Sequence, residues 1–248
     1  MKYDFRKSFD ISYSRCDRWL NLSLVDAVLI AQEMNTDYFR SIESDNLTVK
    51  TRNDALWVLA KTRLHFFSAP KWGDTVDARS YTLKSRGFST EIESVFKKQG
   101  SEDPSFIARQ ELCVIDATKR EPRRIETISY PKDMEVENEA FLMRFFRLKE
   151  EFDKSNLVYS DSFRLTDIDF SNHVNNVAYV RYIVNALSRD FFEKNTVSDF
   201  EIQYRHECFE GHGLEVYKKD VDDHTMDFRI TSDGNTAVDA RIVYEPTC

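Results

Sequence analysis

The order of the predicted elements constrains the fold most, because the same order occurs twice along the chain. In the first half, a short alternating strand at residues 7–13 precedes a long helix at 24–42. Four strands follow the helix, at residues 56–67, 75–83, 88–97 and 106–116. Short turns join these four strands, so neighbours are expected to pair antiparallel. One helix against one antiparallel sheet is an α+β arrangement.

The second half repeats this order. Its predicted elements are a strand at 158–165, a helix at 175–193, and strands at 198–206, 213–219, 224–231 and 236–244. Three residues of the first half map onto the second at a constant spacing of 140 residues, namely Leu64, Gly73 and Val76 onto Tyr204, Gly213 and Val216. The chain is therefore predicted to be a tandem, or double, hot-dog. In this fold two long helices are each wrapped by an antiparallel sheet, and the sheets are joined side by side.

The repeat divides the chain into two halves and a linker. We assign residues 1–130 to an N-terminal hot-dog half, 131–157 to the linker, and 158–248 to a C-terminal half. The linker contains the run EAFLMRFFRLKEEF at 139–152, whose pattern fits a short amphipathic helix.

Local signals support the first two elements. Phe9, Ile11 and Tyr13 alternate with polar residues, so they are expected to share one strand face. Ser23 is a good N-cap for the following helix, and Asp26 supports its first turn. The first half of this helix is apolar around most of its circumference, which predicts burial under a sheet.

Composition excludes several classes of function. The formal net charge of −8 argues against nucleic acid as the main partner. Six glycines disfavour a phosphate-binding loop, and 19 phenylalanines favour a large aromatic interior that could hold an apolar ligand. The four cysteines form no CxxC pair, which is typical of a reduced, cytoplasmic protein. We expect no signal peptide, transit peptide, membrane span, metal or cofactor.

The most informative stretch precedes the helix of the second half. Asp169, Ser171 and His173 are spaced at i, i+2 and i+4, so in an extended loop they point to one side. A base, a group that orients it, and the unpaired amides of a helix N-terminus are what hydrolysis of a thioester or ester requires. In the alternative interpretation, Asp169 and Ser171 make loop hydrogen bonds, Asn175 or Asn176 caps the helix, and His173 fills space.

A second stretch, Tyr204 to Cys208, ends the next strand. In a regular strand Glu207 and Cys208 point to opposite faces, and the apolar alternation places Cys208 inside and Glu207 outside. A Cys–His nucleophile pair is therefore an alternative to a carboxylate. A metal site formed by His206, Cys208 and His212 matches no tight template.

Over nearly its whole length the sequence resembles the acyl-acyl carrier protein (acyl-ACP) thioesterases of plants and bacteria. DIDFSNHVNNVAY at 167–179 resembles their DxDxNxHVNNxxY motif, and YRHEC at 204–208 resembles YRREC. Segments 31–33, 57–59 and 70–74 are also similar. The resemblance implies a double hot-dog fold. It also implies hydrolysis of the thioester between a fatty acyl chain and the phosphopantetheine arm of a carrier protein, which terminates fatty acid synthesis.

The resemblance implies site roles too. The catalytic Asp, His and Glu of the family fall on Asp169, His173 and Glu207, while Ser171 stands where the family has Asn. Either Ser171 substitutes, or Asn172 takes the role through a shifted loop, or activity is reduced. The implied mechanism has Glu207 or His173 activate a water, or Glu207 attack directly to give an anhydride. Asp169 orients His173, and backbone N–H groups near Asn175 and Asn176 stabilise the oxyanion.

The first half and the surface complete the prediction. The corresponding loop, residues 14–19, contains no histidine, so one active site per chain is expected. Trp57 is a candidate for the acyl pocket, although an ordinary core position is the better explanation for it. An acidic carrier protein needs a basic docking surface, for which Arg120, Arg123 and Arg124 are candidates. A hot-dog acyl-coenzyme A thioesterase, a hot-dog dehydratase and a non-catalytic acyl-binding protein remain alternatives, and a homodimer remains open.

Overall fold

The computed structural model describes residues 4–136, 141 and 143–247. The chain divides into two compact units, Met1–Arg144 and Phe145–Cys248. Among the described residues, no helix combines the length and the apolar character that crossing a bilayer requires.

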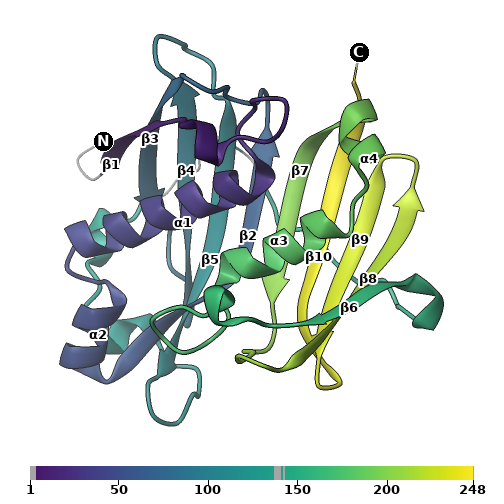
Figure 1. Cartoon of the computed structure of the whole chain (residues 1–248). Coiled ribbons are helices and arrows are strands. Elements are labelled where there is room, and N and C mark those ends of the chain that lie inside the picture. The colour runs from purple at the N-terminus through teal and green to yellow at the C-terminus, as the bar shows by residue number, and fades with distance from the viewer. Residues whose placement is uncertain (1–3, 137–140, 142, 248) are drawn as a thin grey trace. The chain divides into compact units, whose positions relative to one another are not determined.

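The first unit contains one long helix and five strands. The helix α1 (Leu24–Ser41) lies across one face of the sheet in Figure 1. The sheet has the order β1-β3-β4-β5-β2, and each neighbouring pair is antiparallel. Its strands are β1 (Phe5–Asp10), β2 (Ala55–Phe66), β3 (Thr75–Thr82), β4 (Ser89–Lys98) and β5 (Phe106–Asp116).

The second unit repeats this arrangement. The helix α3 (Asn176–Asn185) lies against a sheet of order β7-β10-β9-β8-β6, again with antiparallel pairs. Its strands are β6 (Leu157–Ser162), β7 (Asn195–Tyr204), β8 (Gly213–Asp222), β9 (Thr225–Ser232) and β10 (Asn235–Pro246). Each unit thus has the predicted form of a long helix packed on an antiparallel sheet.

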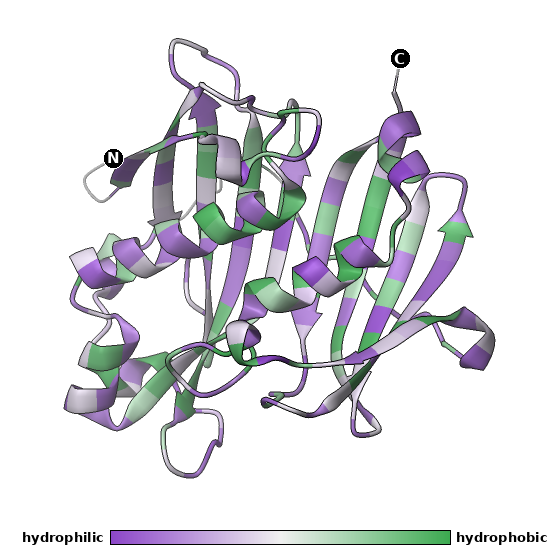
Figure 2. Ribbon diagram, viewed as in Figure 1, coloured by the Kyte–Doolittle hydropathy of each residue, from purple (hydrophilic) through white to green (hydrophobic). Residues whose placement is uncertain are grey.

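Both long helices begin at the residues that the sequence indicates. Ser23 Oγ accepts a hydrogen bond from the Asp26 N–H at 3.0 Å, and Asn175 Oδ1 accepts one from the Val177 N–H at 2.9 Å. Apolar residues are frequent along both helices and along the strands that they cover (Figure 2). The buried side chains of α1 include Ala27, Val28, Ile30, Ala31 and Met34, and those of α3 include Val177, Ala178, Val180 and Ile183.

Three local expectations differ from the structure. The predicted helix at 175–193 is broken, because Ser188 caps a separate helix, α4 (Arg189–Lys194), by accepting from the Phe191 N–H at 3.0 Å. An unpredicted helix, α2 (Asn46–Asn53), follows Asp45, whose carboxylate accepts from two backbone N–H groups of its first turn. Tyr13 lies in the short 3-10 helix η1 (Tyr13–Arg15) and is 71% exposed, because β1 already ends at Asp10.

The segment at 139–152 is not the predicted amphipathic helix where the structure describes it. Residues 139, 140 and 142 lie outside the described residues, and residues 143–153 are neither helix nor strand. Instead, side chains on the sheets form hydrogen bonds with backbone groups of this segment. Arg109 donates to the Met143 carbonyl at 2.6 Å, and Glu201 accepts from the Phe146 N–H at 2.6 Å.

The hydrogen bonds reveal the true spacing of the repeat. Gly73 donates its N–H to the Ile11 carbonyl at 3.0 Å, and Gly211 donates to the Phe163 carbonyl at 2.9 Å. Both glycines have positive φ, whereas Gly213 begins β8 without it. Gly73 therefore corresponds to Gly211, so the sequence-derived spacing of 140 residues is wrong by two. The correct equivalence matters for the site, because it aligns the two loops that follow β2 and β7.

Candidate active site

The loop before α3 is a closed turn that ends at His173. An antiparallel bridge between Ile168 and Val174 closes it. Inside the bridge, the Asp169 N–H donates to the His173 carbonyl at 2.9 Å, and the Asn172 N–H donates to the Asp169 carbonyl at 3.1 Å. These bonds fix the backbone of His173 directly before the N-terminus of α3.

The Asp169 carboxylate shapes the turn from within. Its Oδ1 accepts the Ser171 N–H at 2.8 Å, which is a side-chain turn of the Asx type. Asn172 follows with a φ of 62°, in the left-handed region that asparagine tolerates better than most residues. The Ser171 and Asn172 side chains are both exposed. Of the three side chains spaced at i, i+2 and i+4, the aspartate is thus used in holding the loop, as the second interpretation of this stretch expected.

A second aspartate, Asp167, which was not among the predicted site residues, anchors the base of the turn. The Asp167 carbonyl accepts the Asn175 N–H at 2.7 Å. Its carboxylate is buried and accepts the Tyr182 hydroxyl at 2.7 Å and the Arg164 N–H at 2.9 Å. Burial and then the hydrogen bond to Asp167 raise the pKa of Tyr182. The first Asp of the DxD pair and a tyrosine on the buried face of the helix were the available signals.

Glu207 and Cys208 lie in a loop and not in the strand. The strand β7 ends at Tyr204, because the N–H groups of Arg205 and His206 both donate to the Ala237 carbonyl, at 2.8 and 3.2 Å. The alternation that placed Glu207 on the outer face therefore does not apply to it.

The loop after β7 is tied to the turn before α3. The Val174 N–H donates to the Cys208 carbonyl at 2.9 Å. This bond brings the two segments together, and the Glu207 Oε2 atom lies 3.5 Å from the His173 Nε2 atom. The Phe209 ring packs edge-on against the imidazole, with ring centres 5.1 Å apart.

The His173–Glu207 pair is open to solvent on one side. The His173 side chain is 26% exposed and the Glu207 side chain 41% exposed. Both groups are therefore accessible to a substrate while Phe209 limits the motion of the ring. An imidazole beside a carboxylate can take a proton from water and return it to a leaving group.

The Cys208 thiol has a different environment. It is 1% exposed, and its Sγ atom lies 3.8 Å from the His206 carbonyl, to which it donates. Burial raises the pKa of the thiol above its ordinary value, so the thiolate that a cysteine nucleophile requires is disfavoured.

Asn175 acts as the N-cap of α3, and both its backbone N–H and its side-chain oxygen already form hydrogen bonds. Its N–H donates to Asp167, and the Val177 N–H donates to the Asn175 side chain. Asn176 occupies the first helical position, where no preceding helical carbonyl is available to its N–H.

The suggested metal ligands do not form a cluster. His212 Nδ1 lies 2.6 Å from an Asp233 carboxylate oxygen, and the side chain of Cys208 is turned toward the backbone of His206. In the part of the chain that the structure describes, no group of three His, Cys, Asp or Glu side chains is placed to hold a metal ion.

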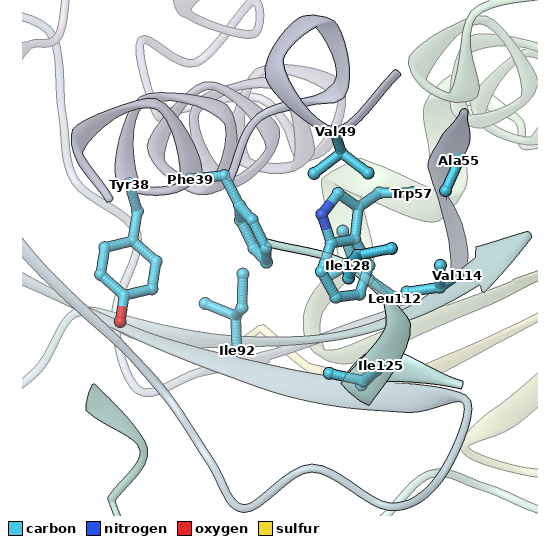
Figure 3. Close-up of a cluster of buried hydrophobic side chains, with 10 residues drawn as sticks. All are labelled: Tyr38, Phe39, Val49, Ala55, Trp57, Ile92, Leu112, Val114, Ile125 and Ile128. Carbon is cyan, nitrogen blue, oxygen red and sulfur yellow. The ribbon is translucent and has the colours of Figure 1, made fainter. Parts of the chain in front are cut away.

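Trp57 lies in the core of the first unit (Figure 3). Its Nε1–H donates to the Ser44 carbonyl at 2.9 Å, and its ring packs against Phe39 with centres 5.0 Å apart. Its other neighbours in this cluster include Val49, Leu112, Val114 and Ile128. The contacts are those of a core residue, and a role in acyl binding stays a prediction.

The three candidate docking arginines differ in their surroundings. Arg123 is partly buried and donates to the Asn53 and Asp54 carbonyls at 2.7 and 3.1 Å, so it holds the end of α2. Arg120 and Arg124 are exposed, and Arg124 forms an ion pair of 3.4 Å with Glu126. Arg123 is therefore the least exposed of the three.

Comparison with known proteins confirms the resemblance. Residues 150–246 match the family model of the acyl-ACP thioesterase C-terminal domain. Among curated proteins, the chloroplastic dodecanoyl-[acyl-carrier-protein] hydrolase of Cinnamomum camphora is 25% identical, over 82% of this chain and 56% of that protein. The chloroplastic oleoyl-acyl carrier protein thioesterase of Coriandrum sativum is 20% identical, over 62% of this chain and 44% of that protein. The chain thus spans about half the length of these relatives.

Solved structures confirm the fold over nearly the whole chain. An acyl-ACP thioesterase from Bacteroides thetaiotaomicron superposes with a TM-score of 0.90 at 14% identity, covering 98% of each chain. A 12:0-ACP thioesterase from Umbellularia californica gives 0.87 at 19% identity, covering 99% of this chain and 98% of that one. The predicted α+β tandem hot-dog fold is therefore confirmed.

Proposed function

We propose that the protein hydrolyses the thioester of a fatty acyl-ACP to a free fatty acid and the carrier protein. The observation that carries the proposal is the His173–Glu207 pair, 3.5 Å apart and open to solvent before the N-terminus of α3. The names of the relatives, which are hydrolases and thioesterases of acyl carrier protein substrates, support the substrate class.

The pair supplies general acid–base chemistry. A water molecule beside His173 gives a proton to the imidazole, which Glu207 stabilises, and its oxygen adds to the thioester carbonyl. The tetrahedral intermediate then collapses, the C–S bond breaks, and the proton passes to the departing sulfur. In the alternative route, Glu207 attacks first. An acyl group found on a Glu207 peptide by mass spectrometry would favour that route.

The start of α3 supplies charge stabilisation. The Asn176 N–H is the candidate oxyanion donor of this turn, because the N–H groups of Asn175 and Val177 already donate to the Asp167 carbonyl and the Asn175 side chain. The positive end of the helix dipole adds to it. One such donor contributes roughly 10²–10³ in rate in other enzymes.

The decisive experiment compares wild-type protein with His173→Ala and Glu207→Ala on a panel of acyl-ACP and acyl-coenzyme A thioesters. Loss of an acid–base group predicts a fall in kcat of about 10²–10⁴-fold for each variant. Asn21→Ala is the matched control, because Asn21 occupies the corresponding position of the loop in the first unit. Near-normal turnover in both site variants would remove this pair from the proposal.

The same panel separates the alternatives. Faster hydrolysis of coenzyme A thioesters than of carrier thioesters would favour an acyl-coenzyme A thioesterase. Tight acyl binding without hydrolysis over hours would favour a non-catalytic acyl-binding protein. The proposal includes acyl carrier protein as partner and a cytoplasmic location, and sedimentation measurements would test a homodimer.

A further inference from the structure

The turn that carries His173 has a copy in the first unit. There, an antiparallel bridge between Cys16 and Leu22 closes a turn directly before α1, as the bridge between Ile168 and Val174 does before α3. In both turns the residue after the bridge is the N-cap of the long helix, Ser23 in one and Asn175 in the other.

Three hydrogen bonds of the first turn recur in the second, and in the first turn the Asn21 N–H also donates to the Asp17 carboxylate at 3.0 Å. The Asp17 N–H donates to the Asn21 carbonyl at 2.8 Å, as Asp169 does to His173 at 2.9 Å. The side chain of Asp17 accepts the Trp19 N–H at 2.9 Å, matching the 2.8 Å bond from the Ser171 N–H to Asp169.

Both turns also contain one residue with a left-handed backbone conformation. Leu20 has a φ of 65° and Asn172 a φ of 62°, and each donates its N–H to the carbonyl of the aspartate at 3.1 Å. A left-handed conformation is unfavourable for leucine, so the preference of residue 20 itself does not explain it. The bonds to the aspartate impose this backbone in the first unit, and their copy is present in the second.

The two turns differ in their chemistry. Asn21 stands where the second unit has His173. The Leu22 N–H donates to the Pro70 carbonyl at 2.7 Å, which corresponds to the bond from Val174 to Cys208, so Ala69 stands where the second unit has Glu207. The first unit thus keeps the aspartate and its turn without the histidine and the glutamate.

Asp17 is present in a turn that has no imidazole, so the role of this aspartate does not involve an imidazole. We propose that Asp169 is a positioning residue: its Oδ1 atom holds the Ser171 N–H and so fixes the turn that presents His173 to Glu207. The inference rests on the proposed function only for its kinetic consequence, since the turn itself is visible in the hydrogen bonds.

Two substitutions at Asp169 separate the effect of its hydrogen-bond acceptor from the effect of its negative charge. Asp169→Asn keeps an Oδ1 acceptor and removes the negative charge, whereas Asp169→Ala removes both. A positioning role predicts a loss in kcat of about 10²-fold for Asp169→Ala, because a misplaced histidine is costly, and substantial rescue by Asp169→Asn. A carboxylate that orients the imidazole directly predicts a loss of roughly 10⁴-fold in Asp169→Asn, as in serine protease triads, and that result would overturn the proposal.

A second readout does not depend on hydrolysis. Amide hydrogen exchange of Ser171 is expected to accelerate in Asp169→Ala and to stay near the wild-type rate in Asp169→Asn. Asp17→Ala is the matched control, and it should accelerate exchange at Trp19 while leaving kcat unchanged. Unchanged exchange at Ser171 in Asp169→Ala would overturn the proposal even if the wild-type protein proved inactive on acyl-ACP. Inactive wild-type protein with the predicted exchange would instead reject the proposed function alone.

Discussion

At the scale of single residues, two positions distinguish the site from its copy. The turn before α3 carries His173 where the turn before α1 has Asn21, and the loop after β7 carries Glu207 where the loop after β2 has Ala69. Both turns keep an aspartate, a left-handed residue and a helix cap. The proposed chemistry therefore depends on two side chains, one in the turn and one in the neighbouring loop, and the backbone of the turn needs neither of them.

Ser171 is the residue at which the chain departs from the family motif. Its backbone N–H is held by Asp169 and its side chain is exposed, so a longer side chain meets no steric obstacle there. We predict that Ser171→Asn raises kcat on acyl-ACP several-fold, because an amide reaches farther than a hydroxyl and can both donate and accept. Steady-state kinetics check this, and an unchanged or lower kcat would contradict it.

The buried thiol gives a second prediction at this scale. Cys208→Ala removes a sulfur atom that is 1% exposed, so the free energy of unfolding should fall by about 1 kcal/mol, as for other small truncations in a core. Because the pKa of this thiol is raised by burial, kcat should stay within about threefold of wild type. Loss of hydrolysis in a variant that still folds would support the cysteine nucleophile instead.

At the scale of elements, the sequence predicted where the long helices begin better than where helices and strands end. Ser23 and Asn175 sit where the apolar period begins, and both prove to be caps. The break at Ser188 was missed because the apolar pattern continues past it. The end of β7 was missed because it depends on Ala237, a carbonyl 33 positions after Tyr204 that no local pattern reveals. Glu207 was therefore assigned to the strand, whereas it lies in the loop that follows β7.

The unpredicted helix α2 provides a test of capping. The Asp45 side chain accepts the N–H groups of Leu47 and Thr48 at 3.0 and 3.1 Å, and the Thr48 hydroxyl at 2.7 Å. We predict that Asp45→Ala lowers the free energy of unfolding by about 1 kcal/mol at pH 7, measured by urea denaturation. Asp45→Asn retains a capping oxygen, so a loss as large as that of Asp45→Ala would contradict a capping role.

The same residue predicts a pH dependence. Partial burial raises the pKa of Asp45, but the hydrogen bonds from Thr48 and Leu47 outweigh it and hold the pKa below the ordinary value of 3.8. A carboxyl whose pKa is depressed in the folded state stabilises the protein above its unfolded pKa, and this stabilisation is lost as the pH falls through the folded pKa. The difference in unfolding free energy between wild type and Asp45→Asn should therefore shrink below pH 4, and a constant difference would contradict it.

At the scale of the whole molecule, the repeat was visible in the order of elements but not in its spacing. Sequence identity between the halves is too thin to choose between Gly211 and Gly213 as the partner of Gly73, and only the hydrogen bonds and the positive φ decide. The fold class was predictable because two periods, helical and strand-like, alternate in the same order twice.

Net charge also belongs to this scale. The chain carries −8, so an acidic carrier must meet a local basic surface, and Arg120 and Arg124 are exposed. We predict that Arg120→Glu and Arg124→Glu each raise KM for acyl-ACP roughly twofold to fivefold at low salt and leave kcat unchanged. Coenzyme A thioesters are the control substrate. Equal effects on both substrates, or none, would remove these arginines as the docking surface.

In the proposed mechanism, His173 and Glu207 act as one unit. The most direct measurement is a double-mutant cycle of kcat on acyl-ACP with His173→Ala, Glu207→Ala and the double variant. If the pair acts together, the double variant loses about as much rate as the worse single variant. Losses that multiply would show two independent contributions and would contradict the account.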